Sequence, residues 1–145
     1  MDTIVFPVLQ FRRTTIATVG SLEKLTRLSR IGIKKRLLDD VELVDHAGSS
    51  IRIVSAEPIH MLPPRLAMGE FIGYATGNPR YKMKLHFAED SFKPVSLEQV
   101  KAKVRRSFSK DPWWEGLLDF EEFRQAVENA SSVTEIIDVF EQYNQ

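Results

Sequence analysis

The chain has 145 residues, a length that suits one domain, and its 43% hydrophobic and 28% charged side chains exclude a disordered protein. The absence of cysteine excludes disulfides, thiolate metal sites and thiol catalysis, and is compatible with the cytosol. No stretch approaches the roughly 20 apolar residues that span a bilayer, and no signal peptide is expected because no basic segment precedes a long apolar run.

The first third of the chain predicts short strands and helical turns. Residues 3–10 form an apolar, β-prone run, in which Pro7 indicates an edge or bulged strand. Residues 14–19 fit a second short strand. Ser21 suits the N-cap of a helix in which Leu22, Leu25 and Leu28 are spaced for one face. Another short helical turn is expected over residues 33–38.

The middle of the chain predicts a hairpin, an irregular crossing and one clear strand. Residues 41–45 and 50–55 flank a four-residue turn, which is typical of a β-hairpin. Three prolines and three glycines between residues 57 and 78 predict a long irregular connection, with residues 71–75 as an optional strand. Apolar and polar side chains alternate over residues 81–87 and indicate a half-buried strand. Its polar positions are Lys82, Lys84 and His86.

The last third predicts consecutive helices. Capping-box patterns begin at Ser96 and at Ser132. Pro112 suits a first helical position, and Asp119 is expected to cap another helix. Strands in the middle and helices at the end predict a single α+β domain over residues 1–145, an antiparallel sheet packed by helices with consecutive helices at the C-terminus.

The charge distribution is uneven along the chain, although the acidic and basic totals are equal at 20 each. Residues 61–110 carry ten basic and four acidic side chains, whereas residues 111–145 carry one basic and nine acidic. The acidic segment either meets the chain's own basic segment or presents a charged surface to a partner, and both alternatives stay open. The acidic residues proposed for binding are Glu121, Glu122, Glu128, Glu135, Asp138 and Glu141.

Two adjacent tryptophans precede the acidic helices. Trp113 and Trp114 occupy neighbouring helical positions and cannot both point into one core. We expect one to anchor the C-terminal helices and the other to be partly exposed, a composition typical of a binding hot spot. The alternative is that both cover the core from either side of a helix start.

No enzyme, metal or cofactor motif is found in the sequence. The three histidines have neither of the spacings, i, i+2 or i, i+4, that a strand or helix metal site requires. No nucleophile elbow or phosphate-binding glycine loop occurs. A basic strand and helix over residues 81–106 offer nucleic-acid binding as an alternative function, but the strand aromatics lie on the face opposite the lysines, whereas stacking would need both on one face.

Several segments taken together resemble small bacterial immunity proteins of polymorphic or contact-dependent toxin systems. The segments are LEKL (22–25), VDHAG (44–48), IRI (51–53), VSLEQVK (95–101), WW (113–114), Phe120, Ala126 and SVTEII (132–137).

The resemblance implies a cytoplasmic, non-enzymatic protein without cofactors that binds and blocks a cognate toxin, and it supplies no catalytic residues. Many such toxins are basic nucleases, which an acidic patch would fit. The neutral total charge departs from the strongly acidic charge common among nuclease inhibitors, so the class of toxin stays open.

Overall fold

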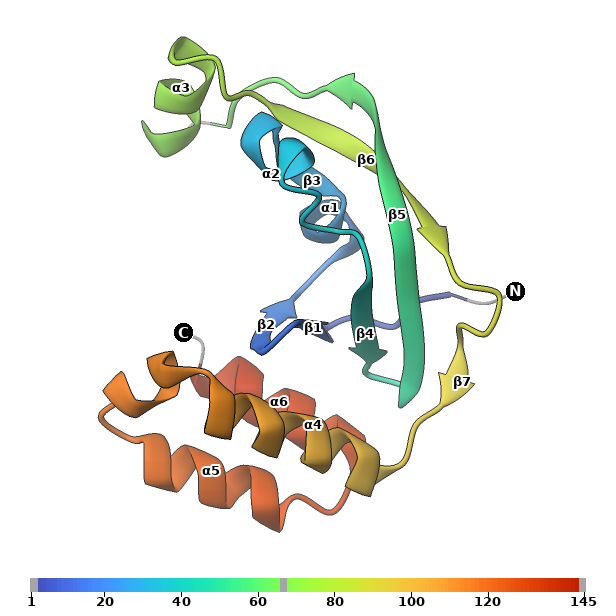
Figure 1. Cartoon of the computed structure of the whole chain (residues 1–145), viewed down its shortest axis with the longest axis vertical. Helices are drawn as coiled ribbons and strands as arrows, with labels where there is room; N and C mark the ends of the chain where they lie inside the picture. Colours follow the sequence, from blue (N-terminus) through green and yellow to red (C-terminus); the bar gives the residue numbers. More distant parts are fainter. Residues whose placement is uncertain (1–2, 66–67, 144–145) are drawn as a thin grey trace.

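The computed structural model describes residues 3–65 and 68–143 and shows the expected α+β architecture, a curled antiparallel sheet with consecutive helices at its C-terminal end (Figure 1). The strands are β1 (Val8–Arg12), β2 (Thr15–Val19), β3 (Arg27–Ser29), β4 (Val41–Asp45), β5 (Ser49–Met61), β6 (Arg80–Phe87) and β7 (Lys93–Pro94). The helices are α1 (Leu22–Leu25), α2 (Arg30–Lys34), α3 (Met68–Ala75), α4 (Leu97–Lys110), the 3-10 helix η1 (Pro112–Gly116), α5 (Phe120–Asn129) and α6 (Val133–Tyr143).

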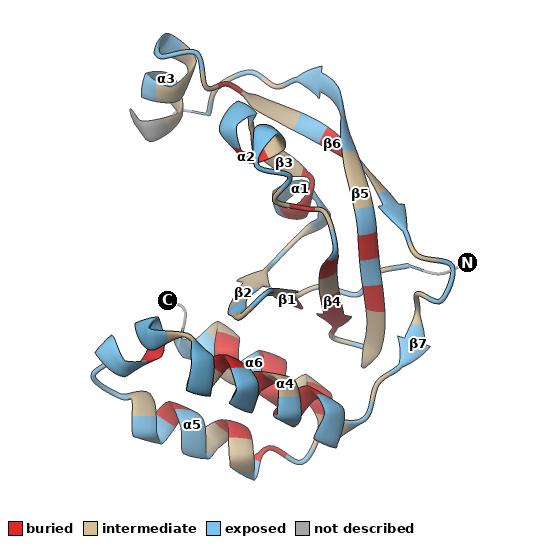
Figure 2. Cartoon of the chain, viewed as in Figure 1, coloured by how far each residue is buried: buried red, intermediate tan, exposed pale blue. Residues whose placement is uncertain are grey.

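The sheet runs in the order β2-β1-β4-β5-β6-β3, and β7 pairs with the start of β5. Successive side chains of a strand point to opposite faces, so β1 contributes Val8 to one core cluster and Leu9 to the other. Leu9 packs with the residues of α4, α5 and α6 that face the sheet. Val8 packs with Leu25 of α1 and with the inner face of β4 and β5. Figure 2 shows the buried positions on the sides of α4 and α6 that face the rest of the protein.

The helix starts at Ser96 and Ser132 follow the predicted caps, whereas Asp119 occupies the N-cap position of α5 without a side-chain cap hydrogen bond. Ser96 and Gln99 exchange both hydrogen bonds of a capping box, at 3.1 and 3.0 Å. At α6 the Ser132 hydroxyl accepts the Glu135 N–H at 3.1 Å, but the Glu135 carboxylate accepts the N–H and hydroxyl of Ser131 instead. The predicted capping box is therefore only half formed, because the Glu135 carboxylate binds Ser131 and not the backbone N–H of the N-cap residue Ser132.

Two expectations for the first third are wrong. β1 begins after Pro7 and lies between β2 and β4, so it is not an edge strand. Proline lacks an N–H and is tolerated where pairing has not yet begun. The helix capped by Ser21 ends at Leu25, because Leu28 enters β3 and pairs with Tyr81.

The expected irregular connection over residues 57–78 is largely regular. β5 continues to Met61, passing through Pro58 opposite Met83 of β6. The optional strand over residues 71–75 is instead part of α3, which ends where Gly77 adopts a φ of +81°. Glycine is favoured there because a left-handed residue commonly ends a helix.

Candidate protein-binding surface

The two tryptophans have opposite environments at the turn between α4 and α5. Asp111 starts η1, its carboxylate accepting the Trp113 N–H at 3.1 Å. Trp114 is 4% exposed, stacks on Phe123 with ring centroids 5.7 Å apart, and donates its indole N–H to the Ser107 hydroxyl at 2.9 Å. Trp113 is 61% exposed. The expectation of one anchor and one exposed tryptophan is confirmed, and Trp114 is the anchor.

Leu118 is fully exposed at the same turn. It stands directly before Asp119, the N-cap residue of α5, a position from which an apolar side chain often packs on the first turn of the helix. Leu117 packs against the core in its place. Neither core cluster includes Leu118, which adds exposed apolar surface to the short segment that also holds Trp113.

Four exposed carboxylates lie in the same short segment, residues 113–122, as these two apolar side chains. We define the corner surface as Trp113, Glu115, Leu118, Asp119, Glu121 and Glu122, all of which are exposed. Glu121 bonds to Arg124 one helical turn further along, at 2.7 Å. Within the described part of the chain, the other three carboxylates have no ion-pair partner. The α5 helix that carries this corner lies on the side of α4 and α6 away from the sheet (Figure 1).

Glu128, at the other end of α5, is engaged by the basic helix α4. Arg105 donates two hydrogen bonds to its carboxylate, at 2.6 and 2.8 Å, and Lys101 donates to its backbone carbonyl at 2.7 Å. The hydrogen bonds from Arg105 hold the pKa of the Glu128 carboxyl below its ordinary value, because they favour the charged form. This residue joins helices and is not free to bind a partner.

The three acidic residues of α6 have different surroundings. Glu135 caps the helix through Ser131, and these hydrogen bonds lower its pKa. Asp138 lies 3.0 Å from the His46 ring nitrogen Nε2 in the β4–β5 turn. Glu141 is half-buried and has no ion-pair partner among the described residues. The six proposed acidic residues therefore do not form one continuous unpaired patch.

The basic helix is occupied mainly by contacts within the chain. Lys103 pairs with Glu42 of β4, and its ammonium lies 5.6 Å from the centroid of the Phe11 ring. Lys101 is buried against α5 and Arg105 pairs with Glu128. These contacts leave few of the helix cations for the phosphates of a nucleic acid.

Each histidine contacts a different group on the surface. His46 faces Asp138, His86 lies 3.1 Å from Glu57, and His60 lies 3.3 Å from the backbone carbonyl of Met61. Over residues 3–65 and 68–143, no group of three or more metal-binding side chains converges. No helix in these two stretches is both long and apolar enough to cross a bilayer.

Comparison with protein-family models, curated proteins and solved structures found no match for this chain. The resemblance to immunity proteins therefore stays a prediction. Sequence reasoning found Trp113, Glu121 and Glu122 but missed Glu115, Leu118 and Asp119. The adjacent leucines at 117 and 118 give no sign of which one faces the core, and the sequence predicts Asp119 only as a helix cap.

Proposed function

We propose that this protein is a non-enzymatic inhibitor that binds and neutralises a protein toxin in the cytoplasm, with the corner surface as its contact. The observation that carries the proposal is an exposed tryptophan and a fully exposed leucine in one short segment, residues 113–122, that also carries four exposed carboxylates. Among the described residues, three of these carboxylates have no ion-pair partner and the fourth, Glu121, pairs with Arg124. Tryptophan dominates the binding energy of many interfaces. Carboxylates around it accelerate encounter with a basic surface and reject acidic ones.

The corner surface favours a basic partner that offers an apolar pocket. Trp113 and Leu118 would enter the pocket, while Glu115, Asp119 and Glu122 would meet the basic rim. A nuclease toxin has such a rim around its nucleic-acid cleft, because phosphate binding requires cations. Occupying the cleft would block the substrate sterically, without any chemistry from the inhibitor.

The test is rescue of growth. The product of the gene beside this one is expressed in a sensitive host with the wild-type protein or with the double variants Trp113→Ala/Leu118→Ala and Glu121→Lys/Glu122→Lys. We expect the wild type to restore growth and bind the purified toxin. Each double variant should weaken binding at least about tenfold, the cost of losing one hot-spot side chain. Binding should also weaken as salt rises.

The matched control is Glu89→Lys/Asp90→Lys, the same charge change at two exposed residues between β6 and β7. It should protect as well as the wild type. The proposal fails if the neighbouring product is harmless and no basic protein binds. It also fails if a toxin is neutralised equally well by the wild type and the corner variants.

A further inference from the structure

A second candidate surface, formed by different elements, is the unpaired edge of β6. β6 pairs with β5 along its whole length, but on its other side it pairs with β3 only over residues 80–82. The pairing ends with the Met83 N–H, which donates to the Thr26 carbonyl at 2.7 Å. Among the described residues, no strand covers this side of residues 84–87.

The backbone of β6 directs two pairs of polar groups to that side. Ala88 donates its N–H to Arg52 of β5 at 2.9 Å, whereas Met83 donates toward β3. Backbone groups alternate in direction along a strand, so the N–H and C=O of Leu85 and Phe87 point away from β5. Within the described chain these groups have no hydrogen-bond partner. They match the hydrogen-bonding pattern of one added strand.

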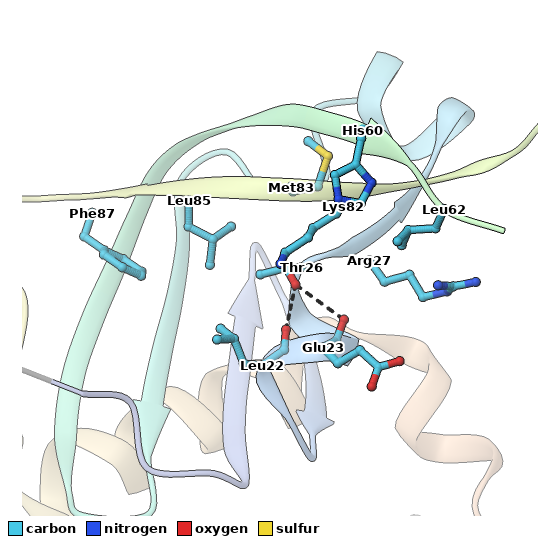
Figure 3. Close-up of a pocket in the computed structure, with 10 residues that line it drawn as sticks. All are labelled: Leu22, Glu23, Thr26, Arg27, His60, Leu62, Lys82, Met83, Leu85 and Phe87. Atoms are coloured by element: carbon cyan, nitrogen blue, oxygen red, sulfur yellow. Dashed lines mark hydrogen bonds between the residues drawn. The ribbon is translucent and has the colours of Figure 1, made fainter.

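An apolar cavity of about 670 Å³ lies beside this edge, between α1 and β6. Figure 3 shows Leu85 and Phe87 extending from β6 toward Leu22 of α1. Leu22 is 54% exposed and Phe87 is 38% exposed. The cavity can take an apolar side chain, and the open strand edge can hold the backbone that carries it.

The charges at the cavity favour an acidic residue on the incoming segment. Two charged residues of the lining are already paired, Glu23 with Arg65 and Arg27 with Glu70. Lys82 also lines the cavity and has no ion-pair partner in the described chain. Lys84, two residues further along the same face of β6, likewise has no ion-pair partner among the described residues. A second copy of this chain is disfavoured as the occupant, because pairing two β6 edges would bring these lysines together.

We propose that residues 84–87 of β6 dock an extended segment of a partner polypeptide. The segment adds a strand to the edge, places an apolar side chain in the cavity and sets a carboxylate against Lys82. Backbone hydrogen bonds would supply affinity, and the cavity and Lys82 would supply specificity for the sequence of the bound segment. This site is independent of the corner surface, since it needs neither α5 nor η1.

The test uses three acetylated octapeptides of alternating valine and a second residue, which is glutamate, serine or lysine. Each is titrated into ¹⁵N-labelled protein. With the glutamate peptide, we expect the amides of Leu85 and Phe87 to shift and to exchange more slowly, whereas those of Lys84 and His86, which face β5, should not. The glutamate peptide should bind at least about tenfold more tightly than the lysine peptide, the effect of one favourable charge contact.

Two substitutions at one position separate the backbone from the side chain. Phe87→Ala removes the ring but keeps the N–H, whereas Phe87→Pro also removes the N–H and leaves the pairing with β5 intact. The proline variant should bind at least about fivefold more weakly than the alanine variant, the value of one hydrogen bond. Lys82→Glu should reverse the preference between the glutamate and lysine peptides.

Several results would overturn the proposal. One is no shift of the Leu85 and Phe87 amides at about 1 mM glutamate peptide, the weak end of measurable recognition. Another is an equal response to all three peptides, or a response confined to other residues. A third is protection of the same two amides without peptide in a dimer detected by sedimentation, which would make a second copy the occupant.

Discussion

Arg105 of α4 holds the carboxylate of Glu128 in α5 with two hydrogen bonds, from Nε at 2.6 Å and from Nη2 at 2.8 Å. A bidentate hydrogen-bonded ion pair of this kind is stronger and more directional than an ion pair with a single contact. It joins the basic middle of the sequence to its acidic end. Among the described residues, the other proposed acidic side chains form no ion pair or hydrogen bond with α4, although the charge of Lys101 helps to lower the pKa of Glu135. The acidic segment is therefore only partly neutralised by its own chain.

The first prediction concerns acid stability. Because the pKa of Glu128 is lowered in the folded protein, its contribution is present above the unfolded pKa and is lost as pH falls through the folded pKa. Glu128→Gln should therefore be less stable than wild type near pH 7, by at most about 1 kcal/mol because the pair is partly solvated. The difference should shrink as pH falls through the lowered pKa of Glu128, because protonation removes the charge that the glutamine variant lacks. Urea unfolding across pH measures it.

The control for this prediction is Glu122→Gln, which removes an exposed carboxylate that has no ion-pair partner in the described chain. It should leave the pH dependence of stability unchanged. A Glu128→Gln variant with a wild-type profile from acid to neutral pH would show that the pair contributes nothing to folding.

The second prediction separates the tryptophans by their roles. Trp114→Ala should destabilise the protein by about 3–5 kcal/mol, because it leaves a cavity among the aromatic rings of α4, α5 and α6. Trp113→Ala should cost less, at most about 1.5 kcal/mol, because its exposed ring contacts only the edge of Trp114, with ring centroids 4.9 Å apart. Chemical denaturation of both variants measures this. Equal losses would mean that Trp113 supports the fold, which would undermine its use as a binding probe.

Regular local patterns were the predictable part of this fold. The capping residues Ser21, Ser96 and Ser132 each accept the N–H three residues later, because a cap depends on neighbours in sequence. The hairpin of β4 and β5 and the alternation of β6 were equally visible. Such features need no knowledge of the rest of the chain.

The errors arose where tertiary context overrides local preference. Pro58 suggested the end of a strand, but it faces Met83, whose backbone groups point away from β5, so no N–H is required there. The aromatic and branched residues at 71–75 favour a strand, yet they form a helix tied to β3 by the pair of Glu70 with Arg27. A contact between residues 43 positions apart cannot be read from either segment alone.

In the candidate sites too, local features could be predicted from the sequence, whereas features that depend on tertiary packing could not. The sequence predicted that one of the two adjacent tryptophans would be buried and the other exposed, but it did not show that Trp114 would be the buried one. The open edge of β6 was beyond sequence reasoning, because it exists only where β3 stops pairing after Lys82. β3 begins only at Arg27, just after α1 ends, so no residue of β3 lies beside residues 84–87 of β6.

The third prediction concerns the buried carboxylate of Asp45, which is 1% exposed. It accepts three backbone N–H groups, from Val5 at 3.0 Å, Ala47 at 3.1 Å and Ser49 at 2.9 Å. Asp45→Ala would leave these three buried N–H donors without an acceptor, and it should lower the unfolding free energy by about 2–3 kcal/mol. Asp45→Asn keeps one acceptor oxygen and should lose less. If alanine proves as stable as aspartate by urea unfolding, the turn does not depend on this carboxylate.

The last prediction concerns how α3 is held against the sheet. Glu70 of α3 pairs with Arg27 of β3, and both side chains are largely buried. The hydrogen bond from Arg27 lowers the pKa of Glu70, so the contact is present at neutral pH and is lost as pH falls through that lowered pKa. In Glu70→Ala, the backbone amides of residues 71–75 should exchange faster with solvent, while those of β6 keep their protection. Hydrogen exchange at neutral pH measures both sets of amides in one experiment.

Glu57→Ala, which removes an exposed carboxylate of β5, is the control and should leave the exchange of α3 unchanged. Unaltered exchange of α3 in Glu70→Ala would mean that apolar packing alone holds the helix.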